Sequence, residues 1–297
     1  MRNLVVGVNG TTSSARALEW AAATVGPHGQ VHAVAAVAPP TELAVVPAPG
    51  SGETYLQLLQ RELDEVWAAR IRQRVGTFSA VAMEGEAADA LLAVASDRQA
   101  DAVVVGAHVP PRAMPKTIGT TTRHLLRSLE YPLVVVADGA THGLMDGGSV
   151  IVGIGHGEAT EAAVCWAARL ADERDLAVGL VRATGEGPVF QVDGLLSLLA
   201  YYIDPSKRAE WTSEDLADFA QQVQSMTKRD LSVAVSAPPG LPAVRLVDES
   251  ATASLLVLGQ HRSMITGAPH TTQPLRHALT HALCPVVVIP AGFEPVS

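Results

Sequence analysis

The sequence repeats itself over nearly the whole of its 297 residues. Matching residues early in the two copies are 146 positions apart, and matching residues later in them are 153 apart. The matches pair Val6-Gly7-Val8 with Val152-Gly153-Ile154, Trp20 with Trp166, Gly106 with Gly259, His108 with His261, Arg123 with Arg276, and Pro132 with Pro285. An offset that changes once indicates an internal duplication with one net insertion in the second copy.

The duplication predicts two domains of similar architecture. We expect a first repeat over residues 1–138, a Gly-rich linker over 139–149 with almost nothing to bury, and a second repeat over 150–297. The extra residues should lie between the first helix and the fourth strand of the second copy. The irregular stretch 185–204, which includes the apolar segment Leu195–Tyr202, is the expected insertion.

Short apolar runs alternate with segments of helical periodicity in each repeat. In the first repeat the expected strands are 4–8, 31–37, 79–83, 102–105 and 133–136, and the expected helices are 15–25, 53–75, 87–98 and 120–128. Strands and helices at this spacing predict an α/β fold with a doubly wound parallel sheet of the flavodoxin-like (Rossmann-like) kind in each repeat. A ligand should then bind beyond the carboxyl ends of strands one and four, where the strand order reverses.

Composition indicates which partners the protein is not expected to bind and where in the cell it is expected. The formal net charge of −9, with only three lysines, argues against broad attraction to nucleic acid or to an anionic membrane surface. No apolar run reaches the roughly 18 residues of a membrane span, and the chain begins directly in a strand, so we expect a cytoplasmic protein. Cys165 and Cys284 lack metal-site spacing and are expected to be core thiols.

One stretch in the first repeat has the residues of a phosphate-binding turn. The buried strand Asp101–Gly106 leads into a Pro-rich loop, and Gly119-Thr-Thr-Thr122 then opens a helix. Backbone N–H groups at a helix start, together with hydroxyls, suit an anion. The alternative interpretation is an ordinary capped helix after a flexible loop.

In order, spacing and double occurrence, these segments resemble the universal stress protein family in its tandem two-domain form. The segments that carry the resemblance are 5–10, 17–21, 84–91, 101–106, 119–120, 123–127, 152–154, 254–259, 276–279 and 284–289. The resemblance implies that the two halves pair through their last strands into a pseudo-dimer, for which Leu133–Val136 and Val286–Ile289 are the candidates. It also allows self-association of chains into a homodimer.

Nucleotide-binding members of that family carry Gly, two residues, Gly, nine residues, and Gly with Ser or Thr. Here Gly106 and Gly119-Thr120 fit, Val109 replaces the middle glycine, and Asn9 replaces a first-strand aspartate that accepts from adenosine. The resemblance implies weak or absent binding of ATP, with no metal beyond a nucleotide-bound Mg²⁺. The implied binding residues are Val8, Asn9, Gly10, Thr11, Gly106, His108, Gly119, Thr120, Thr121 and Thr122.

The second repeat departs further from the family's pattern. Gly155 stands at the aspartate position, Arg262 at the middle glycine, and Thr272-Gln273-Pro274 at the helix start, where proline removes a donor N–H. The second site is therefore expected to be degenerate, although Arg262 could still attract a phosphate.

The remaining candidate residues are expected to have structural roles and no catalytic or metal-binding role. His108 and His261 should follow the fourth strands on the ligand side as loop histidines bonded to nearby backbone, whereas His124 and His277 should serve packing or capping. Trp20 and Trp166 are expected in the core. No nucleophile motif, metal-ligand motif or carboxylate pair is present. The resemblance, with the absence of these motifs, implies a non-enzymatic stress-response protein. The alternative is an interaction module that docks a partner through 185–204 without nucleotide.

Overall fold

The computed structural model describes residues 1–37, 54–107, 117–128, 130–137, 144, 148–155, 158–183, 213–262, 268–290 and 292–293. The predicted insertion over 185–204, to which the alternative docking function is assigned, lies outside these residues, as do His108 and Val109.

The first half alternates strands and helices. Its elements are β1 (Asn3–Gly7), α1 (Thr12–Val25), a 3₁₀ turn (Gly26–His28), β2 (Gln30–Val37), α2 (Tyr55–Glu62), a π-helical turn (Leu63–Trp67), β3 (Thr77–Glu84), α3 (Ala87–Arg98), β4 (Ala102–Gly106), α4 (Thr120–Arg127) and β5 (Leu133–Val136).

The second half repeats this plan. Its elements are β6 (Ser149–Gly153), α5 (Glu158–Arg174), β7 (Ala177–Val181), α7 (Ser213–Met226), β8 (Val233–Ser236), α8 (Pro242–Glu249), β9 (Leu255–Gly259), the short pair β10 (His261–Arg262) and β11 (Pro269–His270), α9 (Gln273–His281) and β12 (Val286–Ile289).

All the long strands belong to one ten-stranded sheet with the order β3-β2-β1-β4-β5-β12-β9-β6-β7-β8. Each half contributes parallel strands in the same doubly wound order. The two halves meet where β5 and β12 pair antiparallel, with Val134 opposite Val287. The predicted doubly wound fold and the pseudo-dimer through the last strands are confirmed, and the two predicted sheets form one continuous sheet.

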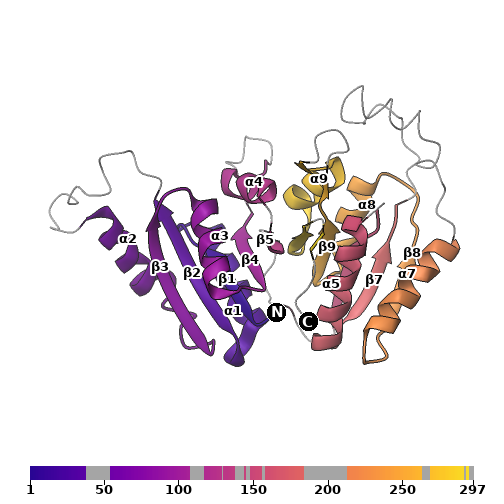
Figure 1. The fold of residues 1–297 in the computed structure, drawn as a ribbon, viewed down its shortest axis with the longest axis horizontal. Helices are drawn as coiled ribbons and strands as arrows, with labels where there is room; N and C mark the ends of the chain where they lie inside the picture. Colours follow the sequence, from indigo (N-terminus) through magenta and orange to yellow (C-terminus); the bar gives the residue numbers. More distant parts are fainter. Residues whose placement is uncertain are drawn as a thin grey trace, which may run out of the picture.

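Helices cover both faces of this sheet (Figure 1). One apolar cluster joins the sheet to α1 and α5, with α7 at its edge, and a second joins the opposite face to α3, α4, α8 and α9. Successive strand residues enter the two clusters alternately, as when Leu4 and Val6 face α1 while Val5 faces α3. The predicted core tryptophans are buried, Trp20 at 2% and Trp166 at 7% exposure. Both cysteines are free, Cys284 buried and Cys165 half-buried.

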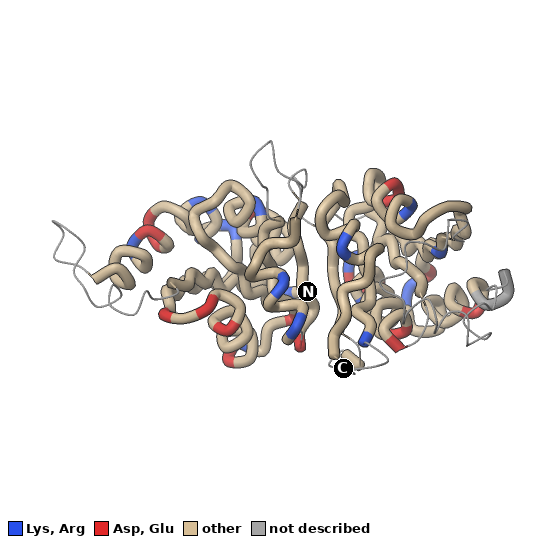
Figure 2. Tube along the Cα trace, turned by 90° about the horizontal axis from the view of Figure 1, so that it is seen from above, with Lys and Arg blue, Asp and Glu red and all other residues tan. Residues whose placement is uncertain are grey.

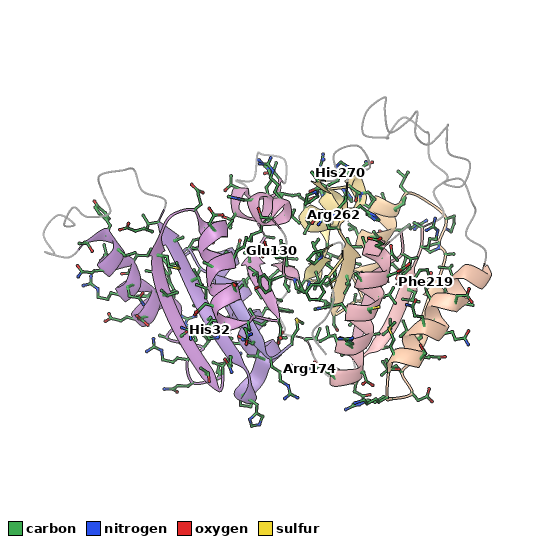
Figure 3. All side chains as sticks on the ribbon, in the orientation of Figure 1. His32, Glu130, Arg174, Phe219, Arg262 and His270 are labelled. Carbon is green, nitrogen blue, oxygen red and sulfur yellow. The ribbon has the colours of Figure 1, made fainter. Side chains whose placement is uncertain are left out.

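Polar contacts join the two halves at the start of the chain. Arg174 of α5 (Figure 3) donates to the carbonyl oxygens of Met1, at 2.9 Å, and Thr24, at 2.8 Å. The amino group of Met1 lies 3.0 Å from the carboxylate of Glu173. These contacts fix the lower end of α5 against the start of the chain.

The prediction that the linker has almost nothing to bury is wrong at Leu144. This side chain is 5% exposed and belongs to the α1-side core, and its N–H donates to Oγ1 of Thr24 over 3.1 Å. One apolar residue in a Gly-rich segment therefore anchors the connection to α1.

The predicted helix over 53–75 is too long. Regular α-helix ends at Glu62, a π-helical turn follows, and irregular turns lead to β3. The N–H of Ala68 bonds to the carbonyl of Leu63 at 3.0 Å, which is an i→i+5 bond. The extra residue in this turn places Trp67 against Gly10, so a tertiary contact overrides the helical periodicity of the sequence.

Seen from above, basic and acidic residues are interspersed over both halves (Figure 2). Among the described helices, none is long and apolar enough to span a membrane.

Candidate functional site

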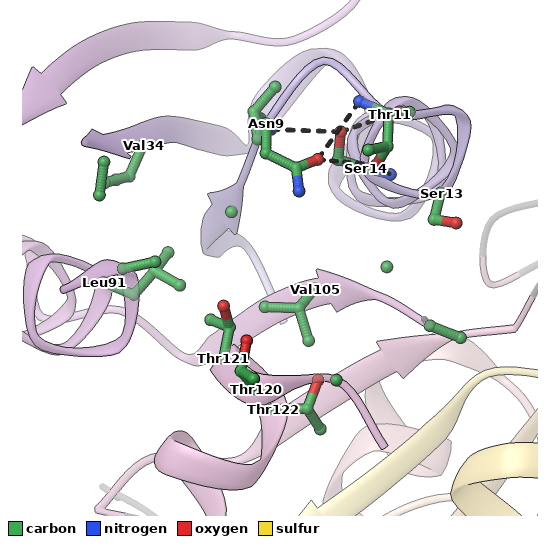
Figure 4. Close-up of a pocket in the computed structure, with 17 residues that line it drawn as sticks. Asn9, Thr11, Ser13, Ser14, Val34, Leu91, Val105, Thr120, Thr121 and Thr122 are labelled. Carbon is green, nitrogen blue, oxygen red and sulfur yellow. Dashed lines mark hydrogen bonds between the residues drawn. The ribbon is translucent and has the colours of Figure 1, made fainter. Parts of the chain in front are cut away.

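A cavity of about 310 Å³ opens in the first half at the carboxyl ends of β1 and β4. This is the point where the strand order reverses, which is where an open α/β sheet binds its ligands. The lining residues come from the loop after β1, from the ends of β1, β2 and β4, and from the starts of α1, α3 and α4 (Figure 4). They are Gly7, Val8, Asn9, Thr11, Ser13, Ser14, Val34, Ala36, Ala87, Leu91, Val105, Gly106, Ala107, Gly119, Thr120, Thr121 and Thr122.

The loop after β1 forms one polar wall. Gly10 adopts a φ of +73°, and the side chain of Asn9 folds back over the turn. Its Oδ1 accepts from the hydroxyl of Thr11 at 2.7 Å and from the N–H of Thr11 at 3.3 Å. Thr11 in turn caps α1 by accepting from the N–H of Ser14 at 3.3 Å. The amide oxygen of Asn9 is thus occupied within the loop, and its NH₂ group is turned toward the cavity (Figure 4).

Gly106 has a packing role at this edge of the sheet. A Cβ at this position would lie 2.8 Å from the Cβ of Ser13 and nearer still to the Ser13 backbone. The same relation recurs in the second half, where a Cβ at Gly259 would lie 3.0 Å from the Cβ of Ala159. Glycine at these strand ends therefore permits the first helix of each repeat to approach the fourth strand closely.

The start of α4 forms the second polar wall. Gly119 is the N-cap, with extended backbone at φ −60° and ψ 157°, and it supplies no side-chain capping bond. The first N–H groups of a helix have no acceptor within the helix and attract anions. Thr120 and Thr121 lie at the cavity with Thr122, which is 4% exposed. This wall consequently presents both hydroxyl and N–H donors to a ligand.

An apolar wall faces these donors. Val34 and Leu91 lie on one side of the cavity, and Val105 lies beside Thr120 and Thr121 (Figure 4). None of the described lining residues carries a charge. The cavity can thus hold a flat apolar ring at one end and accept hydrogen-bonding groups at the other.

Eight of the ten residues that the sequence predicts for the site line this cavity. They are Val8, Asn9, Thr11, Gly106, Gly119, Thr120, Thr121 and Thr122. Gly10 shapes the turn and lies against Trp67 instead, and His108 lies outside the described residues. Sequence reasoning missed the other lining residues, which are Gly7, Ser13, Ser14, Val34, Ala36, Ala87, Leu91, Val105 and Ala107. The serines follow a strand and could have been included, whereas the apolar residues have the same pattern as core.

The equivalent region of the second half has the same hydrogen bond after its first strand, but a histidine ring lies beside that loop. The N–H of Gly155 donates to Oγ1 of Thr160 at 3.1 Å, just as the N–H of Asn9 donates to Oγ of Ser14 at 3.3 Å. Here, however, the ring of His261 lies beside Gly155, since a Cβ added there would be 3.3 Å from its Nε2. His261 lies in the strand β10 opposite His270, which corrects the prediction of a loop histidine. Burial first, and His270 second, lower the pKa of His261.

The helix start in the second half is closed by its own residues. Thr272 caps α9 by accepting from the N–H of Leu275 at 3.4 Å, and proline follows in the first turn. In α4 the corresponding cap is Gly119, which has no such side chain. The predicted asymmetry between the two helix starts is therefore present in the structure.

Potential metal ligands do not cluster at either position. Within the described ranges, no group of three or more His, Cys, Asp or Glu side chains is placed to hold a metal ion.

Comparison with known proteins matches both halves of the chain to one protein family. The family model described as "Universal stress protein family" matches residues 1–137 and 148–290. A universal stress protein from Archaeoglobus fulgidus DSM 4304 has a similar fold, with 12% identity, coverage of 97% of this chain and 98% of that chain, and a TM-score of 0.65.

A second solved structure has a comparable likeness. It is a putative universal stress protein from Pseudomonas aeruginosa UCBPP-PA14, with 13% identity, coverage of 98% of this chain and 93% of that chain, and a TM-score of 0.59. No curated protein matches the sequence. With matches over both halves and the doubly wound order in each, the chain belongs to the universal stress protein family.

Proposed function

We propose that this universal stress protein binds an adenine nucleotide in its first half and that this binding serves a stress response. The cavity at the ends of β1 and β4 carries the proposal, because an apolar wall and a donor-rich helix start meet there. Its volume of about 310 Å³ is at the small end of the range for ligand sites, roughly 300–1,000 Å³.

The base would lie against the apolar wall. Val34, Leu91 and Val105 offer aliphatic surface to a purine ring. The loop carrying Asn9 and Thr11 closes over the same space and would contact the ribose or the ring edge. The phosphates would extend toward Gly119 and the threonines of α4, where hydroxyl groups and free N–H groups favour anions.

Two features support weak affinity. The oxygen of Asn9 already accepts two bonds from Thr11, so Asn9 presents donors where the family's aspartate accepts from adenosine. The described cavity walls also contain no lysine or arginine to offset the charge of the phosphates. Dissociation constants of about 1 mM to 1 μM correspond to about −4 to −8 kcal/mol, and we expect values toward the weaker end of that range.

The proposal assigns no reaction to the cavity, and ATP incubated with the protein should be recovered unchanged. It assigns no nucleotide to the second half, where His261 lies beside Gly155 and Thr272 caps α9. The proposed nucleotide site therefore lies in the first half alone.

Calorimetric titration with ATP tests the proposal, with mass spectrometry of small molecules that co-purify with the native chain. A matched pair of variants locates the site. Ala36→Phe places a ring in the cavity, at a half-buried position, and should abolish the heat. Ala234→Phe, on an exposed position of the edge strand β8, should leave it unchanged. Nucleotide-free protein that gives no heat with millimolar ATP would contradict the proposal.

A further inference from the structure

The strand β3 forms one edge of the ten-stranded sheet, and α2 lies beside it (Figure 1). The N–H groups of Thr77 and Gly85 donate to the carbonyl groups of Gly29 and Val37, on the β2 side. Because backbone groups alternate in direction along a strand, the even-numbered residues 78–84 direct theirs away from the sheet. A row of backbone groups at a sheet edge can pair with a strand of another chain.

The side chain of Gln60, from α2, occupies the middle of this edge. Its Oε1 accepts from the N–H of Ala82 at 2.7 Å, and its Nε2 donates to the carbonyl oxygen of Ala80 at 3.2 Å. A further strand would bond to these same two backbone groups. The amide of Gln60 therefore takes the place of a peptide group of a neighbouring strand.

Two further contacts hold this amide in place. Nε2 of Gln60 also donates to Oδ2 of Asp64 at 2.6 Å, and Oδ1 of Asp64 accepts from Nη2 of Arg72 at 2.6 Å. The guanidinium group of Arg72 lies 5.3 Å from the centroid of the Phe78 ring, in β3. The contacts thus run from the amide through a carboxylate and a guanidinium group back to the same edge strand.

The helix that carries Gln60 depends on its contacts with the sheet. It has eight residues, none of them buried. Isolated helices shorter than about 12 residues are marginal in water. Leu59 packs partly buried against the core, and Gln60 supplies the bonds to β3. The same side chain therefore covers the strand edge and helps to keep α2 there.

We propose that β3 is a self-association surface that Gln60 keeps closed, and that the open edge would pair with β3 of a second copy of this chain. The outward groups of residues 78–84 are symmetric about Val81, so two copies can pair antiparallel around a two-fold axis at that residue. Residues 77–83 carry no charge that would oppose this pairing. The chain already contains one antiparallel pairing of short apolar strands, between β5 and β12.

This surface is separate from the proposed nucleotide site. None of the described residues that line the cavity comes from α2 or β3. The inference therefore does not depend on nucleotide binding.

Sedimentation velocity of the full chain over a range of concentrations tests the proposal. Gln60→Ala removes both bonds to β3 and should add a species of twice the wild-type mass, which grows with concentration. Gln221→Ala is the matched control, at an exposed position of α7, the helix that contacts the other edge strand, β8. It should sediment as wild type does. A Gln60→Ala chain that also sediments as wild type does overturns the proposal.

Two further variants separate an open edge from a loosened helix, with circular dichroism melting as the check on the fold. Gln60→Glu also loses the donor to Ala80 and sets a second carboxylate beside Asp64, but its charge at the edge opposes a second copy, so it should keep the wild-type mass. Adding Ala82→Pro to Gln60→Ala removes an outward N–H that the pairing needs, and should restore the wild-type mass. Self-association of either variant to the extent of Gln60→Ala would assign the effect to the loosened helix and contradict the proposal.

Disulfide cross-linking identifies the strand that pairs. With Val81→Cys added to Gln60→Ala, the two introduced thiols would face each other, because directly opposed residues of a non-hydrogen-bonded pair have Cα atoms about 4.5 Å apart, within reach of a disulfide. Mild oxidation should then give a covalent dimer. Gln60→Ala alone, which keeps the native Cys165 and Cys284, should give none. A dimer that forms without this cross-link would rule out antiparallel pairing through β3.

Discussion

Gln260 of the second half donates from Nε2 to the backbone carbonyl of Leu126 in the first half, over 2.7 Å. Leu126 lies in the last turn of α4, where carbonyl groups have no donor within the helix. Gln260 is only 3% exposed, so water cannot replace it there. The position equivalent to Gln260 in the first half is Ala107, which cannot return the bond. One half therefore fixes the end of the helix whose beginning forms the other half's cavity.

Replacing Gln260 with Leu should destabilise the protein by about 1–3 kcal/mol, because it leaves the Leu126 carbonyl buried without a donor. Urea unfolding measures the change. The exposed Gln224→Ala on α7 is the control and should shift the free energy of unfolding by no more than about 0.5 kcal/mol. Equal stability of the two variants would show that the bond across the halves contributes nothing.

Adding a methyl group at Gly106 or Gly259 should destabilise the fold by about 1–3 kcal/mol in each case, because α1 or α5 must move away from the sheet. Only Gly106→Ala should also weaken ATP binding, since Gly106 alone lines the cavity. Thermal unfolding and calorimetry on the two variants separate these effects. If both variants alter ATP affinity equally, the first-half cavity is not the binding site.

Asn9→Asp should strengthen adenosine binding about 10-fold. A carboxylate keeps oxygens for the Thr11 bonds and offers further lone pairs to the ligand, and bonds to charged groups are worth about 1.5–3 kcal/mol. Calorimetry with adenosine, which carries no phosphates, isolates this contact from phosphate repulsion. Thr12→Asp adds the same charge on a neighbouring exposed residue outside the cavity and should give no gain. A similar gain there would assign the effect to general electrostatics.

His32 should make the fold sensitive to acid (Figure 3). It is 3% exposed in β2 with Nδ1 2.6 Å from the hydroxyl of Ser79, and burial first, then Arg98, lower its pKa. The unfolded chain, with an ordinary pKa of about 6.5, takes up the proton at higher pH than the folded chain. The stabilising contribution is therefore present above about pH 6.5 and is lost as the pH falls below that value.

The free energy of unfolding in urea, measured at about pH 7.5 and about pH 5.5, checks this dependence. His32→Val combined with Ser79→Ala removes the titrating ring and the hydroxyl beside it, and should reduce the loss of stability on acidification. An identical loss in wild type and variant would assign the acid sensitivity to other groups.

Much of the architecture could be predicted because local signals and tertiary structure agree. The strand over 133–136 and the helix over 87–98 have the predicted bounds, since the apolar run begins after Pro132 and the helical segment begins shortly after Gly85. The helix over 53–75 was predicted too long, because its π-helical turn accompanies a contact of Trp67 with Gly10. Such a contact joins segments that are distant in the sequence.

The cavity residues also fall into those that the sequence reveals and those that it does not. Polar residues after strands, such as Asn9 and Thr120, stand out from the sequence, whereas Val34 and Leu91 resemble ordinary core residues until the fold exposes one side of them. Gly106 illustrates a different limit. The family's pattern suggests a ligand contact, and the structure adds a packing constraint from Ser13 that would conserve glycine even without a ligand.

The pairing of β5 with β12 inside one chain also bears on how the two copies can diverge. Identical subunits that pair through such strands must accept every substitution twice, once on each side of the interface. Fusion frees each copy from that symmetry, so Gln260 can arise without a counterpart and His261 can enter the space beside Gly155 while the other copy keeps its cavity. In one chain, two halves that differ in this way are always present in equal amounts and always paired.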